Sequence, residues 1–294
     1  MRPEALALLA AACWAVSSLF SAPPAQRLGA WAFSRWRMLF AAVLLWTLAL
    51  SSGGWRSLDV AALGWLGLSG LIGIFLGDTA LFACMNRLGP RRSGVLFACH
   101  ALFSGVLAWV WLDERLWGPA LLGSLLLVAG VMLAIVWGKR EDEAHPWEQT
   151  QGRLAVGVAL GLLAALCQSM ATLMLKPLMS TGMDAVAASA VRMTLALVAH
   201  SLLWLLWRGA RAQAPLRWQD AALTFLSAAV AMALGMTLIL KAMALGQAGL
   251  VAVLSSVTPI LVLPLLWLVY RRRPAPAAWW GAALAVLGTT LILR

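Results

Sequence analysis

Long apolar stretches separated by short polar breaks run through the whole chain. A helix needs about 20 largely apolar residues to cross the hydrocarbon core of a membrane. The breaks hold proline, glycine or charged residues, as at Pro23-Pro24 and Gly89-Pro90. Reading from break to break gives ten candidate spans: 5–21, 31–51, 60–83, 93–112, 118–137, 153–175, 184–207, 219–241, 247–270 and 275–293. Because backbone groups must be paired inside lipid, the pattern predicts an all-α membrane protein with ten transmembrane helices.

The longest polar stretch, GKREDEAHPWEQTQGR, follows the fifth span. It divides the chain into a first five-helix repeat at 1–138, a polar linker at 139–152 and a second five-helix repeat at 153–294. An odd number of spans in each half inserts the second half upside down relative to the first. The sequence therefore predicts two inverted repeats.

The two halves carry the same residues at a nearly constant distance, as an internal duplication requires. Three glycine pairs are 158 positions apart: Gly77 with Gly235, Gly123 with Gly281 and Gly130 with Gly288. Two further matches, Arg37-Met38 with Arg192-Met193 and Cys13 with Cys167, are 155 and 154 positions apart. The small drift is the effect expected of loops that differ in length.

The composition excludes the soluble classes of protein. Hydrophobic residues make up 63% of the chain and charged residues 11%, against about a quarter charged in ordinary globular domains. The net charge of +11 comes from residues that punctuate the apolar runs. This distribution favours contact with anionic lipid head groups and not with nucleic acid. The four cysteines lack metal-ligand spacing, and we expect neither a metal nor a cofactor.

Inverted repeats with an odd number of spans are a transporter signature, with the substrate site near the membrane midplane. No phosphate-binding G-x-x-x-x-G-K motif is present in the sequence, which excludes a nucleotide-driven pump of that type. Residues 67–70 match a G-x-S-G serine motif, but no histidine stands in a context suited to activate Ser69. We interpret this motif and the glycines at 67, 70, 73 and 77 as helix packing, and we do not expect an enzyme.

Three ionisable residues inside the spans are candidates for substrate binding or coupling, because charge at this depth is costly. They are Arg37 in the second span, its repeat mate Arg192, and Asp78 in the third span. Each arginine has an alternative interpretation, in which it reaches towards a membrane interface. Asp78 is interpreted either as a proton- or cation-responsive group or as the structural ion-pair partner of Arg37.

The fourth and ninth spans offer further candidates. His100 shares a helix face with Ser104, and it is either a packed core histidine or a proton-coupling group. In the ninth span, Ser256 and Pro259 belong to a polar segment in which proline removes helix hydrogen bonds. We interpret this segment as a hinge that lines a cavity, with a tolerated kink as the alternative.

The sequence resembles the drug/metabolite transporter superfamily and, within it, the EamA-type ten-helix carriers. The resemblance rests on LGDTALFACMNRLGP at 76–90, on LAWVWLDERLWGPALLG at 107–123, and on their counterparts at 234–246 and 258–281. Two departures break the symmetry of the halves: Ala101 stands opposite Pro259, and Arg272 opposite Glu114.

The resemblance implies a multi-pass protein, of the bacterial inner membrane, that exports an amino acid, metabolite or drug-like compound by alternating access. It also implies that the repeat mates Trp14 and Gln168 line a shared cavity. A lipid flippase or a channel on the same scaffold stays open, as does a monomer or a homodimer. Lys and Arg counts place both termini outside the cytoplasm, whereas the family expectation is inside.

Overall fold

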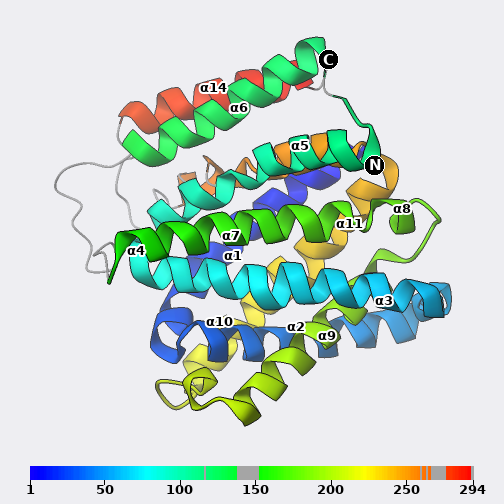
Figure 1. Ribbon diagram of the computed structural model, residues 1–294, viewed down its shortest axis with the longest axis vertical. Coiled ribbons are helices and arrows are strands. Elements are labelled where there is room, and N and C mark those ends of the chain that lie inside the picture. The colour runs from blue at the N-terminus through cyan, green and yellow to red at the C-terminus, as the bar shows by residue number, and fades with distance from the viewer. Residues whose placement is uncertain (116, 138–151, 259, 263, 266–275, 293–294) are drawn as a thin grey trace.

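The computed structural model describes residues 1–115, 117–137, 152–258, 260–262, 264–265 and 276–292. The regular elements of these residues are all helical (Figure 1). The first repeat contains α1 (Pro3–Leu28), α2 (Ala30–Ser52), η1 (Gly54–Ser57), α3 (Val60–Ser69), η2 (Gly70–Asp78), α4 (Thr79–Ala98), α5 (His100–Leu112) and α6 (Gly118–Trp137). The second contains α7 (Leu154–Leu173), α8 (Lys176–Met179), α9 (Ala185–Leu206), η4 (Arg208–Ala210), α10 (Trp218–Ser227), η5 (Ala228–Gly235), α11 (Met236–Leu245), α12 (Ala248–Ser255) and α14 (Pro276–Ile292).

Helices occupy all ten predicted spans within the described residues. Seven are long and apolar enough to cross a membrane: Pro3–Leu28, Ala30–Ser52, Val60–Gly89, Arg92–Leu112, Leu154–Met179, Ala185–Leu206 and Trp218–Leu245. Three shorter apolar helices, at α6, α12 and α14, occupy the remaining spans. Most of the predicted linker at 139–152 lies outside the described residues, so the repeat boundaries stay a prediction.

The predicted break between the third and fourth spans is present inside α4. Gly89 has φ 81° and ψ 163°, which interrupts the helix directly before Pro90. A positive φ is strained for residues with a side chain, and proline disfavours a helical residue before it. The Gly-Pro pair therefore separates the two spans without a long loop.

A π-helical segment interrupts the same helix in each repeat. In the first half it is η2, which follows α3, and in the second half it is η5, which follows α10. Their first residues, Gly70 and Ala228, are 158 positions apart, the offset of the glycine pairs. The duplication therefore extends to an uncommon backbone feature, and such segments are frequent at functional sites.

The two repeats interlock through small residues. A Cβ added at Gly77 would lie 3.1 Å from the Cβ of Cys167, and one added at Gly235 would lie 3.3 Å from that of Cys13. These glycines are repeat mates, and so are the cysteines. The third span of each half thus packs on the first span of the other half, and the interpretation of the glycines as a packing face is confirmed.

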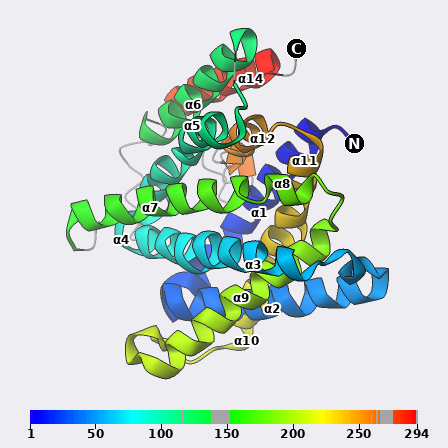
Figure 2. The same ribbon diagram turned by 45° about the vertical axis from the view of Figure 1, so that its right-hand side comes forward.

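The helices α6 and α14 pack side by side at one edge of the molecule (Figures 1 and 2). A Cβ at Gly123 would lie 2.6 Å from the carbonyl oxygen of Gly288, and one at Gly130 would lie 2.5 Å from that of Gly281. The earlier glycine of α6, Gly123, meets the later glycine of α14, and the later one, Gly130, meets the earlier. The helices are therefore antiparallel and related by the pseudo-twofold of the repeats.

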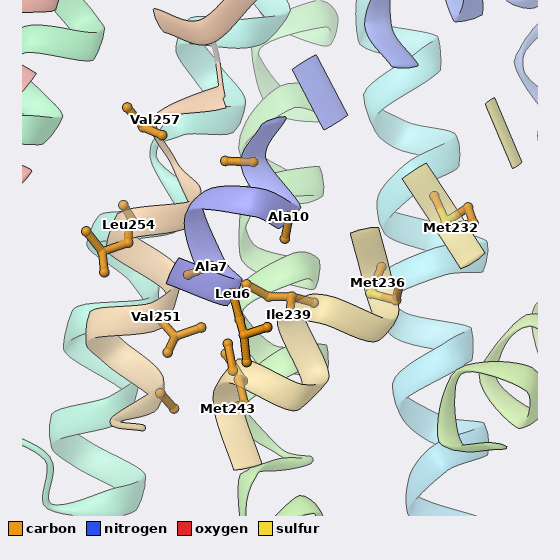
Figure 3. Close-up of a cluster of buried hydrophobic side chains, with 14 of the residues drawn as sticks. Leu6, Ala7, Ala10, Met232, Met236, Ile239, Met243, Val251, Leu254 and Val257 are labelled. Atoms are coloured by element: carbon orange, nitrogen blue, oxygen red, sulfur yellow. The ribbon is translucent and has the colours of Figure 1, made fainter. Parts of the chain in front are cut away.

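Apolar side chains fill the space between α1, α11 and α12 (Figure 3). Leu6 and Ala7 of α1 lie close to Ile239 and Met243 of α11, and Val251 of α12 completes the cluster. Ile239 and Met243 of this cluster also line the cavity described next.

Candidate functional site

A small polar cavity lies between α1 and α5 of the first repeat and α7, α11 and α12 of the second. We call it the polar cavity, and its lining residues are Trp14, His100, Ser104, Gln168, Thr172, Ile239, Met243, Ala252 and Ser255. Both halves contribute polar groups to it. Such a position between inverted repeats is where carriers of this architecture bind their substrates.

The repeat mates Trp14 and Gln168 both line this cavity. The Trp14 indole Nε1 donates to the carbonyl oxygen of Ala231 at 3.1 Å, within the π-helical η5. Gly235 lies beside the indole, since a Cβ there would be 2.9 Å from Nε1. Gln168 Nε2 donates to the hydroxyl of Thr172 at 3.3 Å. The backbone of η5 thus orients the Trp14 indole, and the Thr172 hydroxyl orients the Gln168 amide.

His100 and Ser104 enter the cavity from one face of α5, as their spacing predicted. Ser104 donates to the hydroxyl of Ser169 at 3.0 Å, and Ser169 in turn reaches the carbonyl oxygen of His100 at 2.9 Å. The imidazole packs near the ring of Phe97, with centroids 5.2 Å apart. Among the described lining residues, His100 alone has a side chain that can take up a proton to become a cation.

The ninth-span candidates are placed differently. Ser256 is buried and its hydroxyl donates to the carbonyl oxygen of Val253 at 2.7 Å, whereas its neighbour Ser255 lines the cavity. Pro259 lies outside the described residues, so its role as a hinge stays a prediction. The sequence analysis also missed Thr172, which is one helical turn from Gln168 and shares its face.

Arg37, Asp78 and Arg192 form a second group, on α2, η2 and α9, which is not part of the cavity lining. Arg37 Nη1 lies 3.2 Å from Asp78 Oδ2, so the ion pair that was the structural interpretation of Asp78 is present. The guanidinium of Arg37 also lies 5.2 Å from the ring centroid of Phe82. Both arginines are buried, with 6% and 0% of their surface exposed, so neither reaches an interface. We call these three residues the charge cluster.

Two polar side chains hold the turn between α11 and α12. Lys176 Nζ donates to the carbonyl oxygens of Met243 and Gly246 at 2.7 and 2.5 Å. Glu114 Oε2 accepts from the backbone N–H of Gly249 at 3.0 Å, near the start of α12. We call this pair of contacts the Lys176–Glu114 clamp. It lies at the end of the bundle where the N-terminus lies (Figure 1), because Gly246 also contacts Pro3.

The G-x-S-G motif has a packing role in the structure. Ser69 is fully buried and donates to the carbonyl oxygen of Ala171 at 2.5 Å. Its repeat mate Ser227 bonds to the hydroxyls of Ser17 and Ser21 at 3.1 and 2.8 Å. Each serine thus joins the third span of its half to the first span of the other.

Replacement of Trp14 by phenylalanine tests the bond between the indole and η5. We expect Trp14→Phe to lower the free energy of unfolding by about 1 kcal/mol, because the ring fits but the hydrogen bond from the indole N–H to the Ala231 carbonyl is lost. The measurement is thermal unfolding of the purified protein in detergent. Trp65→Phe is the matched control, because Trp65 is 56% exposed and its indole is not buried. An equal effect of the two changes would contradict the assigned bond.

Comparison with known families decides the class of the protein. The model of the EamA-like transporter family matches residues 1–136 and 155–294. The chain belongs to the EamA-like transporter family. It is therefore a multi-pass integral membrane protein of the drug/metabolite transporter superfamily, as the sequence motifs indicated. No curated protein matches the chain.

A solved structure supports the same fold for this EamA-like protein. The crystal structure of another protein superimposes on it with a TM-score of 0.79 at 16% sequence identity. The superposition covers 99% of this chain and 96% of the other. At this identity the similarity concerns the fold alone.

Proposed function

We propose that this EamA-like protein is a secondary carrier that exports a small organic solute across a bacterial inner membrane by alternating access. The observation that supports the proposal best is the polar cavity, which both inverted halves line and in which the mates Trp14 and Gln168 meet. A site shared by two halves of opposite orientation can be exposed to either side by exchanging their conformations. Neither a cofactor nor an enzymatic step is part of the proposal.

Transport is tested with purified protein in two stages. A thermal-shift screen against amino acids, nucleobases, polyamines and cationic drugs identifies solutes that bind the folded state and raise its melting temperature. Each hit is then tested in proteoliposomes for counterflow, in which unlabelled solute inside accelerates entry of labelled solute. A carrier gives this acceleration. Flux without acceleration would indicate a channel, and binding or movement of lipid alone would indicate a flippase.

His100 is the proposed site of proton coupling. Among the described residues that line the cavity with it, none is charged, and Ser104 and Gln168 supply the polar surroundings. We expect His100→Gln to flatten the dependence of transport on pH, since glutamine does not titrate. Asp78→Asn is measured in parallel, and His145→Gln in the polar linker is the control. If His100→Gln and Asp78→Asn both left the dependence of transport on pH unchanged, proton coupling would be contradicted.

A further inference from the structure

Arg192 is a buried cation for which the described protein supplies no hydrogen-bond acceptor. Its side chain is fully enclosed, and Nε, Nη1 and Nη2 all lack a partner among the described residues. Asp78 interacts with Arg192 electrostatically but gives it no hydrogen bond, and a buried charge without hydrogen-bond acceptors costs several kcal/mol. A guanidinium that the fold buries at this cost is expected to have a ligand in the working protein.

The first repeat shows which ligand this position takes. The residues around the arginine are the same in the two halves, Ser-x-x-Arg-Met at 34–38 and again at 189–193, and both serines are buried. In the first half, Arg37 holds the carboxylate of Asp78 at 3.2 Å. In the second half, the residue 158 positions after Asp78 is Met236. The second half therefore repeats the cation but not its carboxylate.

The charge cluster consequently holds two cations and one anion. Asp78 interacts electrostatically with both arginines, but its hydrogen bond goes to Arg37. Ser189 lies one turn before Arg192 on the same face of α9, and its hydroxyl, like that of its repeat mate Ser34, has no partner among the described residues. A hydroxyl and a guanidinium on one face offer several N–H and O–H donors together. Planar oxyanions, carboxylates above all, match the fork of an arginine.

We propose that Arg192, with Ser189, binds the carboxylate of the transported solute in another conformation of the transport cycle, at a second position outside the polar cavity, so that the carrier exports organic acids. This inference rests on the proposed transport function and names the substrate class. In the present conformation Arg192 is enclosed, with 0% of its surface exposed, and a Cβ at Gly73 of η2 would lie 3.5 Å from its Nη2. The carboxylate therefore binds when α9 and η2 separate. Its binding neutralises the charge of Arg192 and so stabilises the conformation in which the two helices are apart.

The test compares acids with amides of nearly the same shape. Purified protein in neutral phosphatidylcholine nanodiscs is titrated with benzoate and benzamide and with acetate and acetamide, with chloride and phosphate as ionic controls. We expect at least one acid, but not its amide, to raise the melting temperature. Arg192→Gln should weaken the acid about 10- to 100-fold, because it removes charge-assisted hydrogen bonds. Ser189→Ala should weaken it less.

Further arms separate the possible outcomes. Arg56→Gln, in the exposed η1, should leave acid binding unchanged, and Arg192→Lys should retain part of it. Equal responses to an acid and its amide, or full acid binding by Arg192→Gln, would overturn the inference. So would a stabilisation by phosphatidylglycerol nanodiscs that Arg192→Gln abolishes, since a lipid would then occupy the site. Counterflow of a neutral solute, without binding of any acid, would support the transport function and contradict the carboxylate site at Arg192.

Discussion

A single alanine at Gly288 is expected to force α6 and α14 apart. Its Cβ would lie 2.4 Å from the carbonyl oxygen of Gly123 and 2.5 Å from the backbone nitrogen of Leu127. Backbone atoms of a helix cannot rotate away as a flexible side chain can. We therefore expect Gly288→Ala to lower the free energy of unfolding by about 1–3 kcal/mol, the range of overpacked cores.

The repeat relation supplies a second variant and a control. Gly130, the mate of Gly288, faces the carbonyl oxygen of Gly281 at 2.5 Å, so Gly130→Ala should have a similar effect. At Gly105 of α5 an added Cβ meets no atom within 4 Å. Gly105→Ala should leave the melting temperature unchanged or raise it slightly, because alanine favours a helix. Melting temperatures at or above the wild-type value for Gly288→Ala and Gly130→Ala would contradict the antiparallel glycine contact.

The same substitution at the two repeat-related arginines is expected to have effects of opposite sign. Arg37→Met removes the partner of Asp78 and leaves a buried carboxylate without its ion pair. We expect a loss of about 3–5 kcal/mol, the usual cost of breaking a buried pair from one side. Arg192→Met removes a buried cation that has no acceptor among the described residues. Without added solute it should raise the free energy of unfolding by about 1 kcal/mol or more.

The measurement is thermal unfolding of both variants in the same detergent, without organic acids. A double variant, Arg37→Met with Asp78→Leu, is the control for the first change, because an apolar pair should recover much of the lost stability. Destabilisation by Arg192→Met of the same size as by Arg37→Met would show that Arg192 already has a strong partner in the folded protein.

The sequence alone predicts the architecture, because both the spans and their duplication leave regular patterns along the chain. Runs of apolar residues determine the helices, and the 158-position spacing of Gly123 and Gly281 identifies the repeat. The π-helical η2 and η5 could not be predicted in this way. Their residues are as apolar as those of an ordinary helix, and the wider turn depends on packing against α7 and α1.

The candidate site was predicted in part, and the gaps have physical reasons. His100, Trp14 and Gln168 lie where expected, because helical spacing and repeat position determine their faces. The sequence analysis chose Ser256, but Ser255 is the serine that lines the cavity. The choice depends on how α12 is rotated about its axis. Because α12 is apolar on all sides, the sequence does not determine that rotation. The different states of Arg37 and Arg192 follow from Met236, whose equivalence to Asp78 the sequence analysis did not use.

The central claim, alternating access between two inverted halves, is tested most directly by labelling a cysteine in the polar cavity. The four native cysteines are replaced by alanine, which keeps the Cβ atoms that pack on Gly77 and Gly235. Ser255→Cys then places one thiol in the lining. Vesicles of known sidedness are treated with a membrane-impermeant maleimide from each side in turn. The conformational equilibrium is shifted with Lys176→Met, which breaks the Lys176–Glu114 clamp, and Lys241→Met, at an exposed lysine of α11, is the control.

We expect the thiol to be labelled from both sides in the Ser255→Cys protein. Lys176→Met should accelerate labelling from the clamp side and slow it from the opposite side, because the two openings exclude each other. Lys241→Met should change neither rate. Labelling rates that rise together on both sides, or a thiol that reacts from one side alone in every variant, would contradict alternating access.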